Sequence, residues 1–236
     1  MAKRLRMLGI VMIVFGVIFA GAGIFAYTQV QAGADSLQAF SEAQNVTLSY
    51  NEDGQLIDRG TTEMAQEIMV LLEDEWGYPV VESELDPNDP LVNTGTEYMY
   101  QMATIGYHVL HGTQNVTLTE DVVYNDETFA AGDYELFVRT VGDRGELGGY
   151  WTDFDRMHPI EGPARSQAWS GTAHGLFGEL GVGAVTANML TLSTGIAGML
   201  IGLAAAFVLL GAGMIWIATS KDDDVVSISE SEAATV

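Results

Sequence analysis

Histidine is the side chain best suited to hold a transition metal in this chain, because the sequence contains no cysteine. His108 and His111 are three residues apart in a predicted helix, so both imidazoles can face one side. Neutral imidazoles at this spacing can share Zn²⁺ or Cu²⁺, and His158 or His174 could complete the site. The alternative is a pair of ordinary histidines near a helix C-terminus, where an imidazolium suits the helix dipole.

A second chemically capable group lies between residues 151 and 161. It combines aromatic and charged side chains: Trp151, Asp153, Asp155, Arg156 and Glu161. Glycosidases use paired carboxylates to protonate a leaving oxygen, and aromatic rings beside them can hold a sugar. Carboxylates are so numerous in this chain that two of them close together are weak evidence for a glycosidase site. A solvated loop with a local Asp155–Arg156 pair is the simpler interpretation.

Two short segments carry oxygen ligands of the kind that Ca²⁺ accepts. They are Asp86, Asn88 and Asp89, and Asn51, Glu52 and Asp53. Neither follows the spacing of a known calcium loop. We therefore expect weak binding of divalent cations to an acidic surface, and no dedicated cofactor.

Sequence motifs of the common enzyme classes do not occur. There is no H-E-x-x-H, G-x-S-x-G, Walker or dinucleotide-binding pattern. Without cysteine there is no thiolate nucleophile and no disulfide, and no lysine lies between residues 7 and 220 to form a Schiff base. We therefore expect a protein that is not an enzyme.

The elements that position these residues begin with two long apolar runs. Residues 7–27 and about 192–218 contain no charged side chain. A hydrocarbon core about 30 Å thick requires about 20 residues of helix, and both runs meet that length. The sequence thus predicts a membrane protein with two transmembrane α-helices flanking a small α+β extracytoplasmic domain.

Basic residues indicate the orientation of the spans. Lys3, Arg4 and Arg6 precede the first span and Lys221 follows the second, so both termini are expected in the cytoplasm of a cell-membrane protein. A cleaved signal peptide is the alternative for the first span, because Ala32-Gly33-Ala34 has a small-x-small pattern. The apolar run is longer than a usual signal peptide core, which favours a retained anchor.

The region between the spans is strongly acidic. It carries 27 carboxylates against five arginines and no lysine, a net charge of about −22. Such a surface repels nucleic acid and anionic headgroups and attracts cations or basic partners. The same composition suits a protein from a high-salt environment, where self-repulsion is screened.

Local patterns predict the organisation of the chain. Helices are expected over about 61–76 and 94–111, the second opened by a capping box of Thr94 and Glu97. Strands are expected over 45–50, 55–57, 116–118, 122–124 and 134–141, with Asp53-Gly54 as the hairpin turn after the first. Gln44–Leu48 recurs as Gln114–Leu118, which predicts two similar edge strands or an old duplication. The predicted divisions are a cytoplasmic N-terminus (1–6), the first span (7–27), the acidic domain (28–147), a glycine- and aromatic-rich loop with a membrane-proximal helix (148–191), the second span (192–218) and an acidic disordered tail (219–236).

Two further patterns concern contacts and modification. Small residues recur four apart at Gly16 and Ala20, and at Gly198, Gly202 and Ala206, which favours close helix packing between the spans or with a partner. Asn45 and Asn115 lie in N-x-T sequences of the exported region, where glycosylation is chemically feasible.

Residues 83–91, Ser-Glu-Leu-Asp-Pro-Asn-Asp-Pro-Leu, follow the first predicted helix of the domain. This segment and the two-span layout resemble uncharacterised two-span membrane proteins of actinobacteria with an exoplasmic domain. The resemblance covers about a tenth of the chain and implies no activity.

These observations favour an interaction protein anchored in the membrane. We expect a non-enzymatic structural protein, such as an accessory subunit of a cell-envelope complex, in contact with lipid and with other membrane subunits or a second copy. The alternatives are a ligand-binding or sensing ectodomain that signals through a partner, and a metal-dependent or glycan-acting enzyme.

Overall fold

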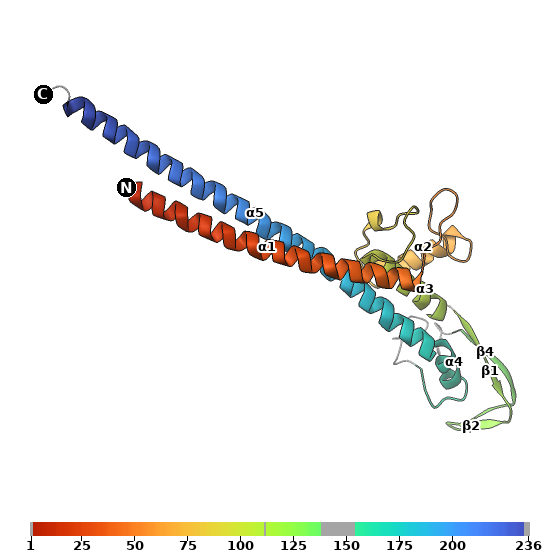
Figure 1. The fold of residues 1–236 in the computed structure, drawn as a ribbon. Coiled ribbons are helices and arrows are strands. Elements are labelled where there is room, and N and C mark those ends of the chain that lie inside the picture. Colours follow the sequence, from red (N-terminus) through yellow and green to blue (C-terminus); the bar gives the residue numbers. More distant parts are fainter. Residues whose placement is uncertain (1, 111, 138–153, 234–236) are drawn as a thin grey trace. The chain divides into compact units, whose positions relative to one another are not determined.

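Two long helices dominate the computed structural model, which describes residues 2–110, 112–137 and 154–233 (Figure 1). Helix α1 spans Ala2–Gln44 and helix α5 spans Gly171–Ala233. Both are long and apolar enough to cross a membrane. Each extends well beyond the predicted span, because neither contains a proline to interrupt the backbone hydrogen bonds.

The tail after the second span differs from its prediction. We expected residues 219–236 to be disordered, whereas the backbone of α5 remains helical to Ala233. Once a helix is formed, each added residue gains a hydrogen bond without a new nucleation cost. The polar composition of the tail therefore did not identify the helix end.

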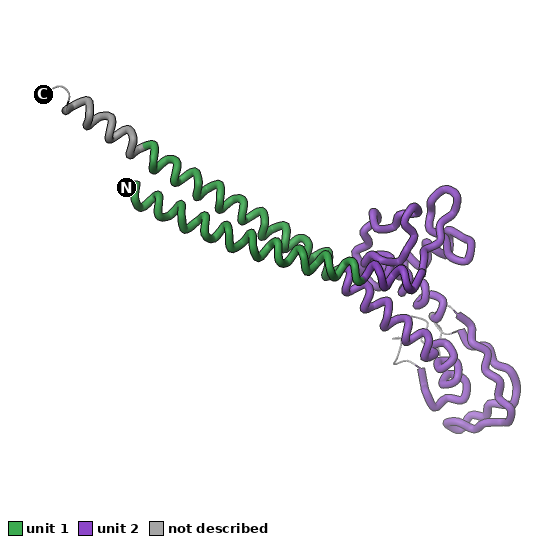
Figure 2. The backbone as a smooth tube through the Cα atoms, in the orientation of Figure 1, with its two compact units in different colours: residues 1–36, 188–236 green, residues 37–187 purple. Residues whose placement is uncertain are grey.

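The chain divides into two compact units, which we describe separately (Figure 2). The helical hairpin consists of residues 1–36 and 188–236, and the central domain consists of residues 37–187. The central domain therefore extends to residue 187, well beyond the predicted domain boundary at residue 147.

Small residues bring the two helices of the hairpin into close antiparallel contact. A Cβ atom added to Gly9 would lie 2.7 Å from the carbonyl oxygen of Gly211, and one added to Gly16 would lie 3.0 Å from that of Ala204. On α1, Gly9, Gly16 and Gly23 are seven residues apart, and on α5 the same spacing relates buried small residues: Ala197, Ala204, Gly211 and Ala218. This seven-residue period keeps one face of each helix on its partner. Phe19 stacks on Phe207 beside this contact, with ring centroids 5.6 Å apart.

The predicted helices of the central domain are present. Helix α2 (Thr62–Val70) begins after Thr61, whose side chain accepts a hydrogen bond from the Met64 backbone N–H. It continues as a π-helix, η1 (Leu71–Glu75), and a 3-10 turn, η2 (Glu82–Glu84), follows. Helix α3 (Gly95–Leu110) starts with the predicted capping box of Thr94 and Glu97.

The strands form two small antiparallel sheets. Strand β1 (Thr113–Leu118) pairs with β4 (Gly132–Phe137), and β2 (Val122–Tyr124) pairs with β3 (Glu127–Phe129). Helix α4 (Glu161–Ala168) follows and contacts β1. The predicted end of the last strand, residues 138–141, lies outside the described residues.

The first copy of the repeated segment is not a regular strand. Gln44 ends α1, and residues 45–57 form only isolated bridges, Thr47 with Leu91 and Tyr50 with Leu56. The predicted turn after Tyr50 is present, because the Asn51 N–H donates to the Gln55 carbonyl. The second copy lies in β1, so the two copies have different structures and the similarity does not extend to the fold.

Tyr98 lies at the centre of the main core of the domain. Its side chain is buried among Leu48, Ile68, Leu72 and other apolar residues. Its hydroxyl lies 2.8 Å from the Ser41 hydroxyl on α1, while its ring lies against Gly183 on α5. The ends of both long helices within the domain are thereby joined to α3.

Candidate functional site

The small-residue stripe predicted on α5 does not contact α1. Gly198, Gly202 and Ala206 are exposed, and nothing lies within 4 Å of a Cβ added to either glycine. Gly16 lies in the hairpin interface as predicted, and Ala20 is half-buried. The α5 stripe is therefore wrong as a contact between the spans, which leaves its other predicted use, contact with a partner.

The main polar cluster of the central domain surrounds His108. Its Nε2 atom lies 2.9 Å from the Asp58 carboxylate, and both side chains are mostly buried. The neighbouring Tyr107 donates a short hydrogen bond to Glu67 and meets the His108 ring edge-on. The Asp58 carboxylate orients the imidazole, as a carboxylate does for a histidine that transfers protons or binds a metal.

Two tyrosine hydroxyls in the same core are buried without a hydrogen-bond partner in the described part of the chain. They belong to Tyr50 and Tyr100. Burial, and then the nearby charges of Glu97 and Asp86, raise the pKa of Tyr50 to about 12. Burial and then the charge of Asp58 raise the pKa of Tyr100. Both hydroxyls therefore stay protonated, and each can donate one hydrogen bond.

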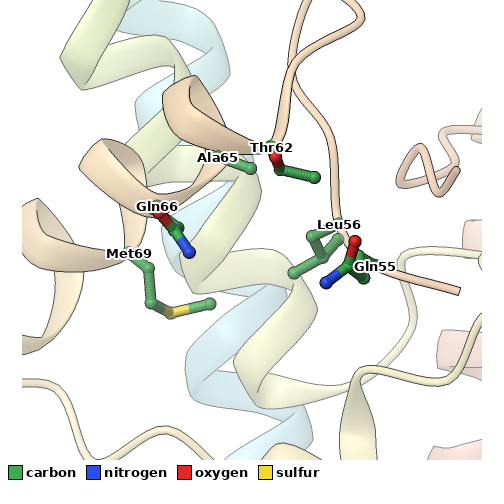
Figure 3. A pocket seen from close by; sticks show the side chains of 6 residues that line it. All are labelled: Gln55, Leu56, Thr62, Ala65, Gln66 and Met69. Atoms are coloured by element: carbon green, nitrogen blue, oxygen red, sulfur yellow. The ribbon is translucent and has the colours of Figure 1, made fainter. Parts of the chain in front are cut away.

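A pocket of about 200 Å³ lies between α2 and the segment that precedes it (Figure 3). Gln55 and Leu56 line one side, and the remaining lining residues come from α2: Thr62, Ala65, Gln66 and Met69. None of these side chains is charged, although the domain around them is strongly acidic. The pocket suits a small uncharged group with apolar surface.

The predicted histidine metal site does not assemble in the described residues. His111 lies outside them, and among them no group of three His, Asp or Glu side chains is placed to hold a metal ion. His158 contacts the rings of Tyr124 and Phe129, and its Nδ1 atom accepts hydrogen bonds from the backbone at the start of α4. His108 and His158 thus occupy separate environments, and His174 lies near the Ser170 carbonyl.

Part of the acidic-aromatic group forms a local network. Asp155 accepts a hydrogen bond of 2.6 Å from the Tyr124 hydroxyl, and Glu161 accepts one from the Asp155 backbone N–H. The Tyr124 hydrogen bond, followed by one from a backbone N–H, lowers the pKa of Asp155. An ionised Asp155 is unsuited to protonate a leaving group. Trp151 and Asp153 lie outside the described residues.

The predicted oxygen-ligand segments use their side chains to form turns. Asp86 accepts hydrogen bonds from the backbone and side chain of Asn88, and Asn51 accepts them from the backbones of Asp53 and Gln55. These are local turn contacts. Binding of cations at these segments stays a prediction.

Both candidate glycosylation sites are accessible. Asn45 and Asn115 are exposed, the first at the residue after α1 and the second within β1. Glycosylation itself stays a prediction.

Sequence reasoning missed the Asp58–His108 pair and the pocket. The paired side chains are 50 residues apart, and no local periodicity relates a turn before α2 to the end of α3.

The chain matches no family model, no curated protein and no solved structure in the comparisons.

Proposed function

We propose that the chain is a membrane-anchored interaction protein, a non-enzymatic accessory subunit of a membrane complex at the cell envelope. In this proposal both termini lie in the cytoplasm and the acidic domain lies outside. The basic residues Lys3, Arg4, Arg6 and Lys221 support this orientation through the positive-inside rule.

The exposed stripe of Gly198, Gly202 and Ala206 is the observation that carries this proposal. The hairpin already pairs its own helices through other small residues, so this stripe is available on a second face of α5. In a bilayer, small residues four apart let another helix approach closely and gain van der Waals contact. Lipid contact alone requires no such spacing.

Purification in gentle detergent at native salt, followed by mass spectrometry, tests the proposal. A reproducible partner should co-purify with the natural chain and should be lost when Gly198 and Gly202 are both replaced by leucine. Gly21→Leu is the matched control, because Gly21 is also exposed within a span and has nothing within 4 Å of an added Cβ. A chain that purifies alone would contradict the accessory-subunit proposal.

The uncharged pocket favours one alternative, a ligand-binding ectodomain. An apolar lining with amide and hydroxyl groups from Gln55, Gln66 and Thr62 suits a small neutral molecule. A library of neutral metabolites should then contain a compound that raises the melting temperature of the natural chain. The gain should disappear when Ala65, a buried residue of the lining, is replaced by leucine. No stabilising compound, or a gain that survives Ala65→Leu, would remove this alternative.

A further inference from the structure

Helix α4 begins at a residue that cannot cap it. Ile160 occupies the N-cap position, and its side chain has no hydrogen-bonding group. The first backbone N–H groups of a helix have no acceptor within the helix, so another group must accept their hydrogen bonds. His158 supplies this group, since its Nδ1 atom lies 3.1 Å from the backbone nitrogen of Ile160 and 3.2 Å from that of Glu161.

These two hydrogen bonds determine the protonation of the His158 ring. A backbone N–H can only donate, so Nδ1 is the acceptor in both hydrogen bonds and carries no proton. The imidazole is then neutral, with its one ring proton on Nε2. An imidazolium has a proton on both ring nitrogens and accepts no hydrogen bond. Protonation of His158 would therefore remove both hydrogen bonds and place a positive charge at the positive end of the α4 dipole.

His158 also joins the start of α4 to the strands. Its ring lies edge-on against the rings of Phe129 in β3 and Tyr124 in β2, with centroids 4.8 Å and 5.6 Å away. Directly after it, Ile160 is buried in a small core with Ala164 of α4 and Val116 of β1. The capped end of α4 is thus part of the contact between this helix and the strands.

The charges around His158 favour its protonated form, in opposition to the cap. In the described residues, the charged or titratable groups of the surrounding elements are Tyr124 in β2, Glu127 in β3, Asp155 and Arg156 before α4, and Glu161 and Arg165 in α4. The carboxylates of Asp155 and Glu161 are the nearest of the anions along the chain, and both would attract an imidazolium. The group therefore has two competing arrangements, a neutral ring that caps α4 and a charged ring held by carboxylates.

We propose that His158 is a pH-sensitive cap of α4, which holds the start of the helix when the ring is neutral and releases it when the ring is protonated. Histidine is the side chain whose charge ordinarily changes between about pH 5 and pH 8. The stabilisation by the cap is present at the alkaline end of this range and is lost as the pH falls through the titration of the ring. The inference concerns the central domain alone and does not depend on the membrane-anchored function proposed above.

Hydrogen exchange at single backbone amides of the natural, full-length chain tests the cap. Exchange at Ile160 and Glu161, corrected for the intrinsic effect of pH on exchange, is compared at about pH 7.5 and about pH 5.5, on either side of the usual imidazole titration. One hydrogen bond typically changes an equilibrium about fivefold, so protection of these amides should fall at least about fivefold at the lower pH. Carboxyl groups titrate at about pH 4 and would not give this response. Equal protection at the two pH values would overturn the proposal.

Two histidine variants assign the response to one ring. An asparagine side chain has an acceptor oxygen and does not titrate, so His158→Asn should show the same protection of Ile160 and Glu161 at both pH values. His174→Asn is the matched control, because His174 lies in the same domain but near the Ser170 carbonyl. It should keep the full pH response of the natural chain.

The variants can also contradict the proposal. A pH response in His158→Asn as large as that of the natural chain, or loss of the response in His174→Asn, would overturn the assignment to His158. The comparison within the natural chain does not require either variant to fold.

Discussion

Replacing Gly211 by alanine should force the two helices of the hairpin apart. The added Cβ would lie 2.5 Å from the carbonyl oxygen of Gly9 and 2.7 Å from Cγ1 of Ile13. Favourable carbon contacts need roughly 3.5 Å or more, so the helices must separate by roughly 1 Å at this level. The carbonyl oxygen belongs to the backbone of α1 and cannot move aside without the helix.

The expected loss of stability in Gly211→Ala follows from comparison with the same substitution at the neighbouring Gly213. Overpacking of a tight contact costs about 1–3 kcal/mol, while Gly→Ala in a helix otherwise gains up to about 1 kcal/mol. Gly213→Ala should show only this gain in stability from helix propensity, because nothing lies within 4 Å of its added Cβ. We expect Gly211→Ala to be less stable than Gly213→Ala by about 1–3 kcal/mol.

Unfolding by titration with SDS measures this difference. Dyes on cysteines introduced at Ala2 and Thr219 would report separation of the helix ends by energy transfer, since the chain has no cysteine of its own. Gly211→Ala should lose energy transfer at a lower SDS fraction than Gly213→Ala. Equal midpoints for the two variants would refute the close contact between Gly9 and Gly211.

Three further predictions concern the central domain. A double-mutant cycle of Ser41→Ala and Tyr98→Phe should give a coupling free energy of about 1 kcal/mol in chemical unfolding, and additive effects would contradict their hydrogen bond. Burial raises the pKa of Glu97 in the folded state above its unfolded value, so its contribution to stability falls as pH rises through that interval. Acidification toward about pH 4.5 should therefore stabilise the natural chain more than the Glu97→Gln variant. The same pH dependence of the melting temperature in both proteins would contradict this assignment. Tyr100→Phe should leave the melting temperature unchanged or higher, because its buried hydroxyl has no hydrogen-bond partner in the described residues, while Tyr107→Phe should lower it by removing the hydrogen bond to Glu67. A fall in melting temperature for Tyr100→Phe as large as that for Tyr107→Phe would reveal a bound partner for the Tyr100 hydroxyl.

Local signals in the sequence predicted the main elements well. The apolar runs lie within α1 and α5, and the Thr94–Glu97 capping box begins α3 as expected. These features depend on residues within a few positions of one another, so they can be predicted without knowledge of the tertiary contacts. Helix ends were harder to predict, because continuing an existing helix costs little.

The faces of the long helices could not be predicted in the same way. A helix that is apolar all round has no polar side to show which face is buried, and glycines occur on every side of α5. The four-residue spacing therefore favoured Gly198 and Gly202, whereas Ala197 and Gly211 make the contact with α1. The paired Asp58 and His108 were missed for a related reason, since their contact depends on the tertiary fold.

The accessibility of single cysteines in intact cells tests whether two spans anchor the chain with its acidic domain outside. Cysteines introduced at Ser220, after the second apolar run, and at the exposed Glu63 of the central domain can be labelled with a membrane-impermeant maleimide. We expect Glu63→Cys to react in intact cells, and Ser220→Cys to react only after the membrane is permeabilised. Labelling of both positions in intact cells, or protection of Glu63→Cys with labelling of Ser220→Cys, would contradict a two-span anchor with the acidic domain outside.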